Sequence, residues 1–406
     1  MGGKTVGITR IVGEFLRLTE GLDSYAFVAF HQESGEFVRL TADEVKELSK
    51  RDRQLVQNAV EDNSYGPVVK WLRRLTPGRL WYRPAFRRVR RCLAKTRRVH
   101  WTKNDIFLQM GLPLSKDSLN AIRQIRLGGA RILLYSHDII PVIRPHYTDV
   151  QTVQNFFNFL DAVLDDQTGI MANSECSRRD IADWMASQGK AVAFLEVVKP
   201  GWELEPVSMV QAIRPEIERL KHRRFALFVS TIEHRKNHDL LYKALLKIIE
   251  QGDEDPPLLV FAGRAGWLVN DLMHDLRHDP RVQAHIQIVN DVNESELDAL
   301  YRYCRFTVFP SLYEGWGLPV SESLSFGKFV LASDRGATPE AAMGLCELIN
   351  PYDSAKWADA LVQYMRDDAL LQSKEATLRA AFVPRPWRVF AQEVLACARR
   401  FESGLR

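Results

Sequence analysis

Two glutamates, Glu314 and Glu322, stand with seven residues between them in a glycine-rich stretch of the second half of the chain. The intervening Gly315 and Gly317 allow backbone amides to approach a ligand closely. Pro319 favours the start of a helix, whose free amides and positive dipole end can hold a diphosphate. Because one carboxylate accepts two hydroxyl donors, a pair aimed at one cleft suits a polyhydroxylated ligand. The alternative is that both are solvated surface acids beside a tight turn.

A pair of cations, Arg235 and Lys236, lies where an apolar strand is expected to lead into a helix. Cations at a helix N-terminus oppose the helix dipole, and a bound anion at that place would offset both. Their position at the carboxyl end of a strand therefore indicates a phosphate-binding role. A solvated basic helix start is the other interpretation.

A third candidate pattern is Asp253-Glu-Asp255, which satisfies the Asp-x-Asp metal and nucleotide motif of a different transferase fold. It lies in the polar connection 251–257, at the amino end of the strand that follows. Ligands in open α/β sheets bind at the opposite, carboxyl ends of the strands. We therefore interpret this pattern as a solvated turn and predict no metal site there.

The elements that must position these residues alternate regularly in the second half of the chain. Near-continuous apolar strands imply burial on both faces, so the alternation predicts an α/β fold with a doubly wound parallel sheet. The expected strands cover residues 225–231, 258–263, 285–289, 305–310 and 329–333, and the expected helices cover 238–251, 269–276 and 293–304.

The first half is less regular but of the same kind. Its expected strands are 25–31, 105–110, 131–136, 169–173 and 191–197, with helices over 152–164 and 177–187. Pro200 and Gly201 interrupt the regular secondary structure, which predicts a domain junction between about 198 and 222. We predict a first domain over 1–203, a second over 204–385 and a final segment, 386–406, whose helix could return across the junction.

The composition describes an ordinary globular chain of 406 residues, 46% hydrophobic and 26% charged, long enough for two cores. No apolar run reaches the roughly 20 residues of a membrane-spanning helix, and the N-terminus lacks a secretory signal pattern. Five widely spaced cysteines without a Cys-x-x-Cys pair argue against a disulfide framework and a zinc site. We therefore predict a cytoplasmic protein.

One segment is strongly basic: residues 70–103 hold thirteen Lys or Arg and no Asp or Glu. Subtracting these thirteen charges from the net charge of +4 leaves −9 for the rest of the chain. Anionic lipid attracts such stretches by about 1 kcal/mol per Lys or Arg near the surface. We predict an anionic membrane surface as the partner, with a solvated basic face as the alternative. No nucleic-acid fold signature accompanies the charge, so nucleic acid is not a predicted partner. The interleaved aromatics are Trp71, Trp81, Tyr82, Phe86 and Trp101.

The stretch from Glu314 to Glu322 resembles the Glu-x7-Glu signature of glycosyltransferase family four, whose members are retaining enzymes with the GT-B fold. The likeness extends over 225–237, 261–263, 289–293 and 333–340, and more loosely over the first half. It implies two Rossmann-like doubly wound domains that face each other across a cleft.

The resemblance also implies roles for matching residues. Glu322 would hold the nucleotide ribose, and Glu314 would contact hydroxyls of the donor sugar. The amides of Gly317 and Leu318 would meet the diphosphate, beside Gly315. The remaining donor-side positions that match the family are Arg235 and Lys236, which would neutralise the diphosphate, and Asp291, in the segment whose backbone contacts the base.

In the first half, His137-Asp138-Ile-Ile-Pro141 resembles the family's His-Asp-x-x-Pro turn. His137 would face the transferred sugar, whereas a lone histidine in a loop is otherwise more often structural. Asp138 would orient it. The segment 173–178 also matches the family, and we interpret it as scaffold in which Ser174 caps the next helix.

The N-terminus departs from the family pattern. Gly7, Thr9 and Arg10 match a glycine-containing loop that faces the donor phosphates and the acceptor. Almost nothing precedes this loop to form the family's opening strand. Either the sequence is shortened, the reading frame begins upstream, or the first half tolerates a missing strand.

The resemblance predicts a retaining glycosyltransferase that moves a hexose from a nucleotide sugar to a hydroxyl of a lipid-linked or growing polysaccharide. The form of residues 231–237 favours mannosyl and rhamnosyl transferases, and GDP-mannose is the first donor candidate. With cations available for the diphosphate, neither a metal nor another cofactor is expected. The enzyme would work at the inner face of the cell membrane. Two rivals stay open: a non-hydrolysing sugar-nucleotide epimerase, and a catalytically silent GT-B subunit of a polysaccharide assembly complex.

Overall fold

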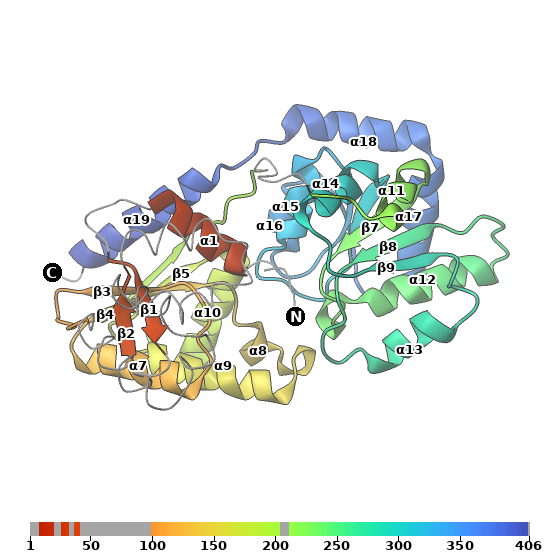
Figure 1. Cartoon of the computed structure of the whole chain (residues 1–406). Helices are drawn as coiled ribbons and strands as arrows, with labels where there is room; N and C mark the ends of the chain where they lie inside the picture. Colours follow the sequence, from red (N-terminus) through yellow and green to blue (C-terminus); the bar gives the residue numbers. More distant parts are fainter. Residues whose placement is uncertain (1–7, 20–25, 32–35, 41–98, 204–210, 405–406) are drawn as a thin grey trace, which may run out of the picture.

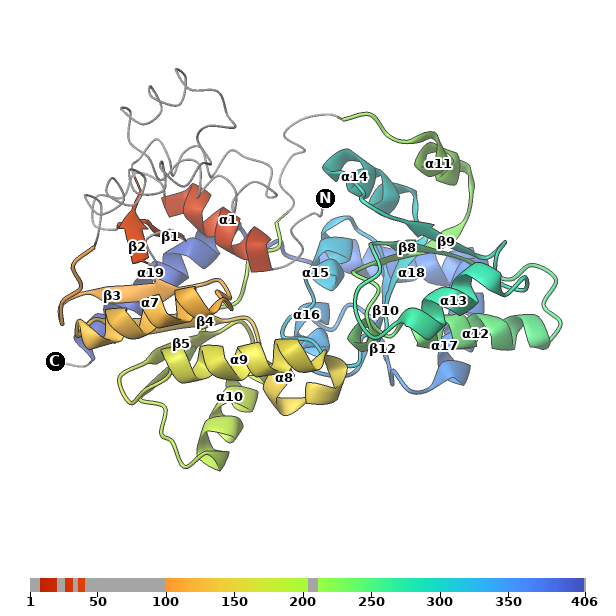
Figure 2. The same cartoon turned by 60° about the horizontal axis from the view of Figure 1, so that its bottom comes forward.

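The computed structural model describes residues 8–19, 26–31, 36–40, 99–203 and 211–404 (Figure 1). Within these ranges the strands form two separate parallel sheets and one antiparallel hairpin. Each parallel sheet carries helices, as Figures 1 and 2 show, and the two sheets lie in different halves of the chain. This is the pair of Rossmann-like domains that the sequence predicts.

The first half contains, in the described ranges, a four-stranded sheet of order β3-β4-β5-β6. The strands are nearly continuous apolar runs, and the buried pattern of β4 and β5 on both faces requires helices on either side. Its elements are α1 (Ile8–Thr19), β1 (Val28–His31), β2 (Glu36–Arg39), β3 (Ile106–Gln109), α7 (Lys116–Leu127), β4 (Arg131–Ser136), α8 (Ile140–Ile143), α9 (Val150–Val163), β5 (Gly169–Ala172), α10 (Glu175–Ser187) and β6 (Phe194–Val197).

The second half contains a six-stranded sheet of order β12-β11-β10-β7-β8-β9. Strand order reverses direction between β7 and β10, and ligands in such sheets bind at that switch point, outside the carboxyl ends. The elements are α11 (Pro215–Glu218), β7 (Phe225–Val229), α12 (His238–Glu250), β8 (Leu258–Ala262), α13 (Asn270–His278), β9 (Ile286–Val289), α14 (Glu294–Tyr303), β10 (Phe306–Phe309), α15 (Leu318–Ser325), β11 (Val330–Ser333), α16 (Thr338–Ala342), β12 (Glu347–Ile349), α17 (Ser354–Arg366) and α18 (Asp368–Ala381).

The chain crosses between the halves twice, at neighbouring places. The first crossing follows β6, and the second leads into the last helix, α19 (Trp387–Ser403). The backbone amide of Trp202 donates to the carbonyl of Arg385 at 3.0 Å, which ties the two crossings together. Gly201 lies so close to Trp387 that an added Cβ would meet its Cα at 2.8 Å. The two connecting segments are therefore closely packed against each other at the junction.

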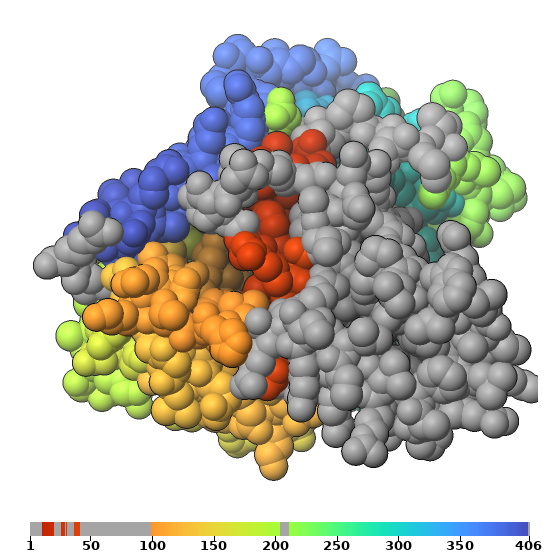
Figure 3. Space-filling model, turned by 60° about the vertical axis from the view of Figure 1, so that its left-hand side comes forward, coloured from red at the N-terminus to blue at the C-terminus, as the bar shows by residue number. Residues whose placement is uncertain are grey.

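Helix α19 returns to the first half and packs on its sheet and on α1. The face of Figure 3 carries α1 in red, with the C-terminal helix in blue and the orange elements of the first half beside it. The apolar side of α19 is buried because Phe390 contacts Tyr135 and Phe15, at ring-centroid distances of 5.4 and 6.4 Å. The last helix thus completes the core of the first half.

The N-terminal region differs from the expectation at Thr9 and Arg10, for which the sequence predicts a loop. Both lie in α1, whose strong amphipathic pattern buries Ile11 and Phe15. Gly7 and the expected missing strand before it lie outside the described residues, as does most of the basic segment 70–103. Of the described helices, none combines the length and the apolar character needed to cross a bilayer.

Candidate active site

Glu314 lies in the loop after β10, and Arg235 and Lys236 lie in the loop after the neighbouring strand β7. Adjacent strands lie about 4.8 Å apart, so loops leaving their carboxyl ends can meet. The carboxylate of Glu314 binds both cations, at 2.7 Å from Arg235 Nη1 and 2.7 Å from Lys236 Nζ. The structure therefore brings three of the predicted residues into one cluster at the switch point of the sheet.

The cluster is buried, and its charges determine its protonation. Burial by itself would raise the pKa of Glu314, but Arg235 and Lys236 together lower it to about 2. Burial alone would lower the pKa of the Arg235 guanidinium. The carboxylates of Glu314, Glu233 and Asp138 outweigh this effect and raise that pKa. Glu314 and Arg235 are thus held in their charged states near neutral pH.

Three glycines shape the backbone around Glu314. A Cβ on Gly315 would lie 2.1 Å from the carbonyl oxygen of His137, so only glycine allows this approach between the two halves. A Cβ on Gly336 would lie 2.7 Å from the amide nitrogen of Glu314. Gly317 has φ +102, a left-handed conformation that side chains rarely adopt, and it precedes α15 without a capping side chain. The first amides of α15, beginning at Leu318, therefore lack an N-cap side-chain acceptor at the position predicted for a diphosphate.

His137 and Asp138 follow β4 of the first half and reach the Glu314 loop from the other side. His137 is buried, and its Nε2 lies 2.7 Å from the carbonyl oxygen of Met110. Burial lowers the pKa of His137 to about 4, although this hydrogen bond opposes the shift. A neutral ring whose Nε2–H donates to Met110 explains both observations. Burial raises the pKa of Asp138, and Arg235 opposes that shift.

Glu322, on α15, is not part of the Glu314 cluster. Its carboxylate accepts a hydrogen bond from the hydroxyl of Tyr301 at 3.0 Å and forms an ion pair with Arg10 of α1. Arg10 also lies over the ring of Trp387, 5.4 Å from its centroid. The carboxylate predicted to hold the ribose is therefore occupied by an arginine from the first half.

The remaining predicted donor residues are more dispersed. Asp291 is exposed in the turn after the edge strand β9 and has φ 50. Thr9 lies in the first turn of α1, and Gly7 lies outside the described residues. The roles of Asp291, Thr9 and Gly7 in donor binding therefore stay predictions.

Several residues of the site were missed in the sequence. Glu233 is 3% exposed and binds Arg235 Nη2 at 2.8 Å, so it holds the terminal nitrogen of the guanidinium that Glu314 does not bind. Tyr301 was also missed. The only signal for Glu233 was its place two residues before Arg235. Tyr301 gave no signal, because it reaches Glu322 from a different helix, α14.

The Asp-x-Asp pattern lies away from this cluster. Asp253 and Asp255 precede β8, at the amino end of the sheet, and Asp253 forms an ion pair with Arg366. They border a surface pocket of about 730 Å³ between α12 and α17. In the part of the chain that the structure describes, no group of three His, Cys, Asp or Glu side chains is placed to hold a metal ion.

Comparison with known proteins agrees with this geometry. Residues 209–380 match the family described as Glycosyl transferases group 1. The O-antigen chain mannosyltransferase B of Escherichia coli is 27% identical over 241 residues, which cover 57% of this chain and 61% of that protein. A D-inositol 3-phosphate glycosyltransferase of Corynebacterium aurimucosum is 25% identical over 218 residues, covering 51% of this chain and 50% of that protein. The chain thus spans less than two thirds of these relatives.

Solved structures extend the likeness to both halves. HepE of Anabaena, in complex with UDP and glucose, has a TM-score of 0.53 at 15% identity, covering 73% of this chain and 77% of that one. Sucrose-phosphate synthase of Thermosynechococcus elongatus has a TM-score of 0.53 at 17% identity, covering 71% and 72%. At these identities the likeness shows the fold.

The likeness to the solved structures defines the fold of this chain as GT-B, with two Rossmann-like domains. Residues 209–380 match the group 1 glycosyl transferases, and the chain is similar to O-antigen mannosyltransferases. The fold class and the family resemblance predicted from the sequence are both confirmed.

Proposed function

We propose that the chain is a retaining hexosyltransferase that uses a nucleotide diphosphate sugar, with GDP-mannose as the first candidate. The acceptor is a hydroxyl of a lipid-linked or growing polysaccharide. The observation that carries this proposal is the Glu314 carboxylate held between Arg235 and Lys236, in a loop whose Gly315 packs against the backbone carbonyl of His137 in the other half. The similarity to the E. coli O-antigen mannosyltransferases supports mannose as the transferred sugar.

In the proposed reaction the bond between the sugar C1 and the phosphate oxygen breaks, and a bond from C1 to the acceptor oxygen forms on the same face. The acceptor proton passes to the leaving phosphate oxygen, so no protein nucleophile is required. Arg235, Lys236 and the first amides of α15 stabilise the negative charge that develops on the diphosphate. Glu314 accepts hydrogen bonds from donor-sugar hydroxyls, and His137 faces the sugar as a neutral ring.

Donor binding also requires a change at Glu322. If its carboxylate is to accept the two ribose hydroxyls, the ion pair with Arg10 must open. Arg10 is then free to face the incoming phosphates, which replace the lost negative partner. The ion pair is therefore proposed as the resting arrangement of the donor site.

The test combines binding with turnover. Nucleotide sugars that raise the melting temperature are assayed for donor consumption with and without a lipid-linked acceptor. We expect Lys236→Ala and Glu322→Ala each to reduce turnover by about 100-fold. This is the typical cost of losing one electrostatic contact to a transition state. Lys243→Ala, an exposed lysine on α12, is the matched control and should keep wild-type turnover. Full activity in the Lys236 variant would contradict the assignment.

The same assay separates the rivals. An epimerase would convert the nucleotide sugar without an acceptor and release no free nucleoside diphosphate. A silent subunit would bind donor and consume none. The buried and charged Glu314 cluster favours the transferase over the silent subunit, because such a costly arrangement contributes little to folding alone.

We also propose that the enzyme binds an anionic membrane surface through residues 70–103. The basis is the strong positive charge of that segment. Sedimentation with vesicles should show binding that requires anionic lipid and weakens as salt is added. Equal binding to neutral vesicles would reject this part of the proposal.

A further inference from the structure

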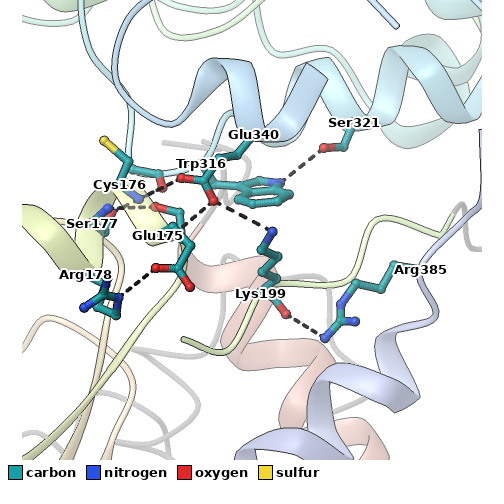
Figure 4. Close-up of polar contacts among 11 residues, drawn as sticks. Glu175, Cys176, Ser177, Arg178, Lys199, Trp316, Ser321, Glu340 and Arg385 are labelled. Carbon is teal, nitrogen blue, oxygen red and sulfur yellow. Dashed lines mark hydrogen bonds and ion pairs between the residues drawn. The ribbon is translucent and has the colours of Figure 1, made fainter. Parts of the chain in front are cut away.

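The N-terminus of α10, in the first half, is capped by a residue of the second half. The first amides of a helix have no partner inside the helix. Ser174 accepts from the amide of Ser177 at 2.9 Å, as the sequence predicts. The two amides before it, those of Glu175 and Cys176, donate instead to the carboxylate of Glu340, at 3.0 and 2.7 Å (Figure 4).

Glu340 lies on α16, which packs against β11 of the six-stranded sheet, so this cap joins the two halves. A carboxylate is favoured at a helix N-terminus by the dipole and by charge-assisted hydrogen bonds. Lys199, in the crossing after β6, lies 3.8 Å from the same carboxylate and over the ring of Trp316. Figure 4 shows Glu340 between the α10 amides and Lys199.

Other residues in the first two turns of α10 contact the loop that carries Glu314. The hydroxyl of Tyr313 donates to the carboxylate of Asp180, at 2.9 Å from Oδ2, and the hydroxyl of Ser177 donates to the carbonyl of Gly315 at 3.3 Å. Tyr313 and Gly315 flank Glu314 directly. Each contact therefore fixes the position of α10 relative to the predicted catalytic carboxylate.

The backbone of the same loop is bound to α16 as well. The amide of Ala337 donates to the carbonyl of Glu314 at 2.9 Å, one turn before Glu340. The Glu314 loop, the start of α16 and the start of α10 are thus connected pairwise by hydrogen bonds. A change at Glu340 would loosen the connection of α10 to this unit while leaving the Arg235 and Lys236 pairs in place.

We propose that Glu340 is a positioning residue that docks the first half of the chain onto the donor-binding half by capping α10. Docking holds the His137 carbonyl against Gly315 and keeps both faces of the site in register. The catalytic consequence rests on the proposed transferase function, whereas the docking itself does not. Glu340 contacts none of the cluster residues through its side chain, so it acts through α10.

The first test measures docking without activity, by hydrogen exchange of the full-length protein followed at residues 174–178. In Glu340→Ala the amides of Glu175 and Cys176 should exchange at least tenfold faster, while the Ser177 amide stays protected. Ser174→Ala is the matched control, since it removes the helix's own cap, and it should give the reverse pattern. Wild-type exchange at Glu175 and Cys176 in the Glu340 variant would overturn the proposal.

The second test separates positioning from binding. Glu340→Ala should lower kcat tenfold or more, with the affinity for nucleoside diphosphate, measured by calorimetry, unchanged. Glu340→Gln, which keeps one acceptor oxygen, should recover part of the loss and serves as the probe if the alanine variant does not fold. Ser174→Ala should keep kcat within about twofold. An unchanged kcat in both Glu340 variants, or an equal loss in Ser174→Ala, would overturn the positioning role.

The two proposals fail in different ways. If no nucleotide sugar supports transfer by the wild-type protein, the proposed function is wrong, and the exchange experiment still decides whether Glu340 docks the halves. If transfer occurs and the Glu175 and Cys176 amides exchange at the same rate in the Glu340 variant as in the wild type, only the docking proposal is wrong.

Discussion

Glu314 is the residue whose charge decides what else can enter the site. It neutralises part of the positive charge of Arg235 and Lys236, and Glu233 binds Arg235 from the other side. A diphosphate that enters must share these cations with two carboxylates already in place. The cations are therefore positioned before the ligand arrives, which avoids their reorganisation during the reaction.

At the same scale, His137 gives the protein a pH dependence whose direction follows from its burial. Its pKa is about 4 in the folded chain and near 6.5 when unfolded. Between these values the unfolded chain binds a proton that the folded chain does not, so stability falls as the pH drops through this window. His238, buried with a pKa lowered to about 3, acts in the same direction.

His137→Gln should weaken that dependence, since Gln can still donate to the Met110 carbonyl but does not titrate. From pH 6.5 to pH 5 the variant should lose about 1.5 kcal/mol less unfolding free energy than the wild type, because the slope approaches about 1.4 kcal/mol per pH unit only below the unfolded pKa. Urea denaturation at the two pH values measures the difference. Parallel losses in both proteins would show that His137 does not titrate in this way.

Much of the site could be predicted at the residue scale, but its internal partnerships could not. The spacing of Glu314 and Glu322 and the strand-end position of Arg235 and Lys236 are local signals. The pairing of Glu322 with Arg10 joins residues 312 positions apart, and no local pattern carries that information.

At the scale of elements, the loops after β4 and β10 can pack closely because Gly315 has no side chain. The approach of Gly315 to the His137 carbonyl is a backbone-to-backbone contact, so no rotamer change can relieve a substitution there. The contact fixes the spacing of the two halves at the site.

Gly315→Ala should therefore force the loops apart. The added methyl group would lie 2.1 Å from a carbonyl oxygen, and misplacement of about 1 Å costs on the order of 100-fold in rate. Turnover of the nucleotide sugar identified by thermal shift measures the effect. Gly111→Ala is the control, because its nearest neighbour would be Gln109 Nε2 at 3.9 Å. Equal turnover in the two variants would contradict the steric argument.

All strands of the two parallel sheets except β12 followed from apolar runs bounded by turn residues, and β4 lies at its expected residues. Helices α7, α17 and α18 were also not predicted. Strand β12 has three residues at the edge of the sheet, and α7 is rich in polar and charged residues outside its buried face. Helix α1 replaced an expected loop, although its amphipathic pattern is a local signal that indicates a helix; its apolar side packs on α19.

At the scale of the whole molecule, α19 makes the first half depend on residues from the other end of the chain. Phe390 is fully buried between Tyr135, Phe15 and Trp387. Phe390→Ala should destabilise the protein by about 3 to 5 kcal/mol, as large-to-small core substitutions do. Denaturant unfolding measures the loss. Arg388→Ala, an exposed change on the same helix, should stay within about 0.5 kcal/mol. A small loss at Phe390 would mean that α19 is not part of that core.

The late position of α19 also sets a schedule for biosynthesis. The four-stranded sheet is complete once β6 has been made, but the helix that seals it begins at residue 387. At 5 to 20 residues per second, a ribosome needs about 10 to 40 s to reach the end of that helix. Throughout this interval the nascent sheet lacks the cover of α19, so the newborn chain is a natural client for chaperones until that helix has been made.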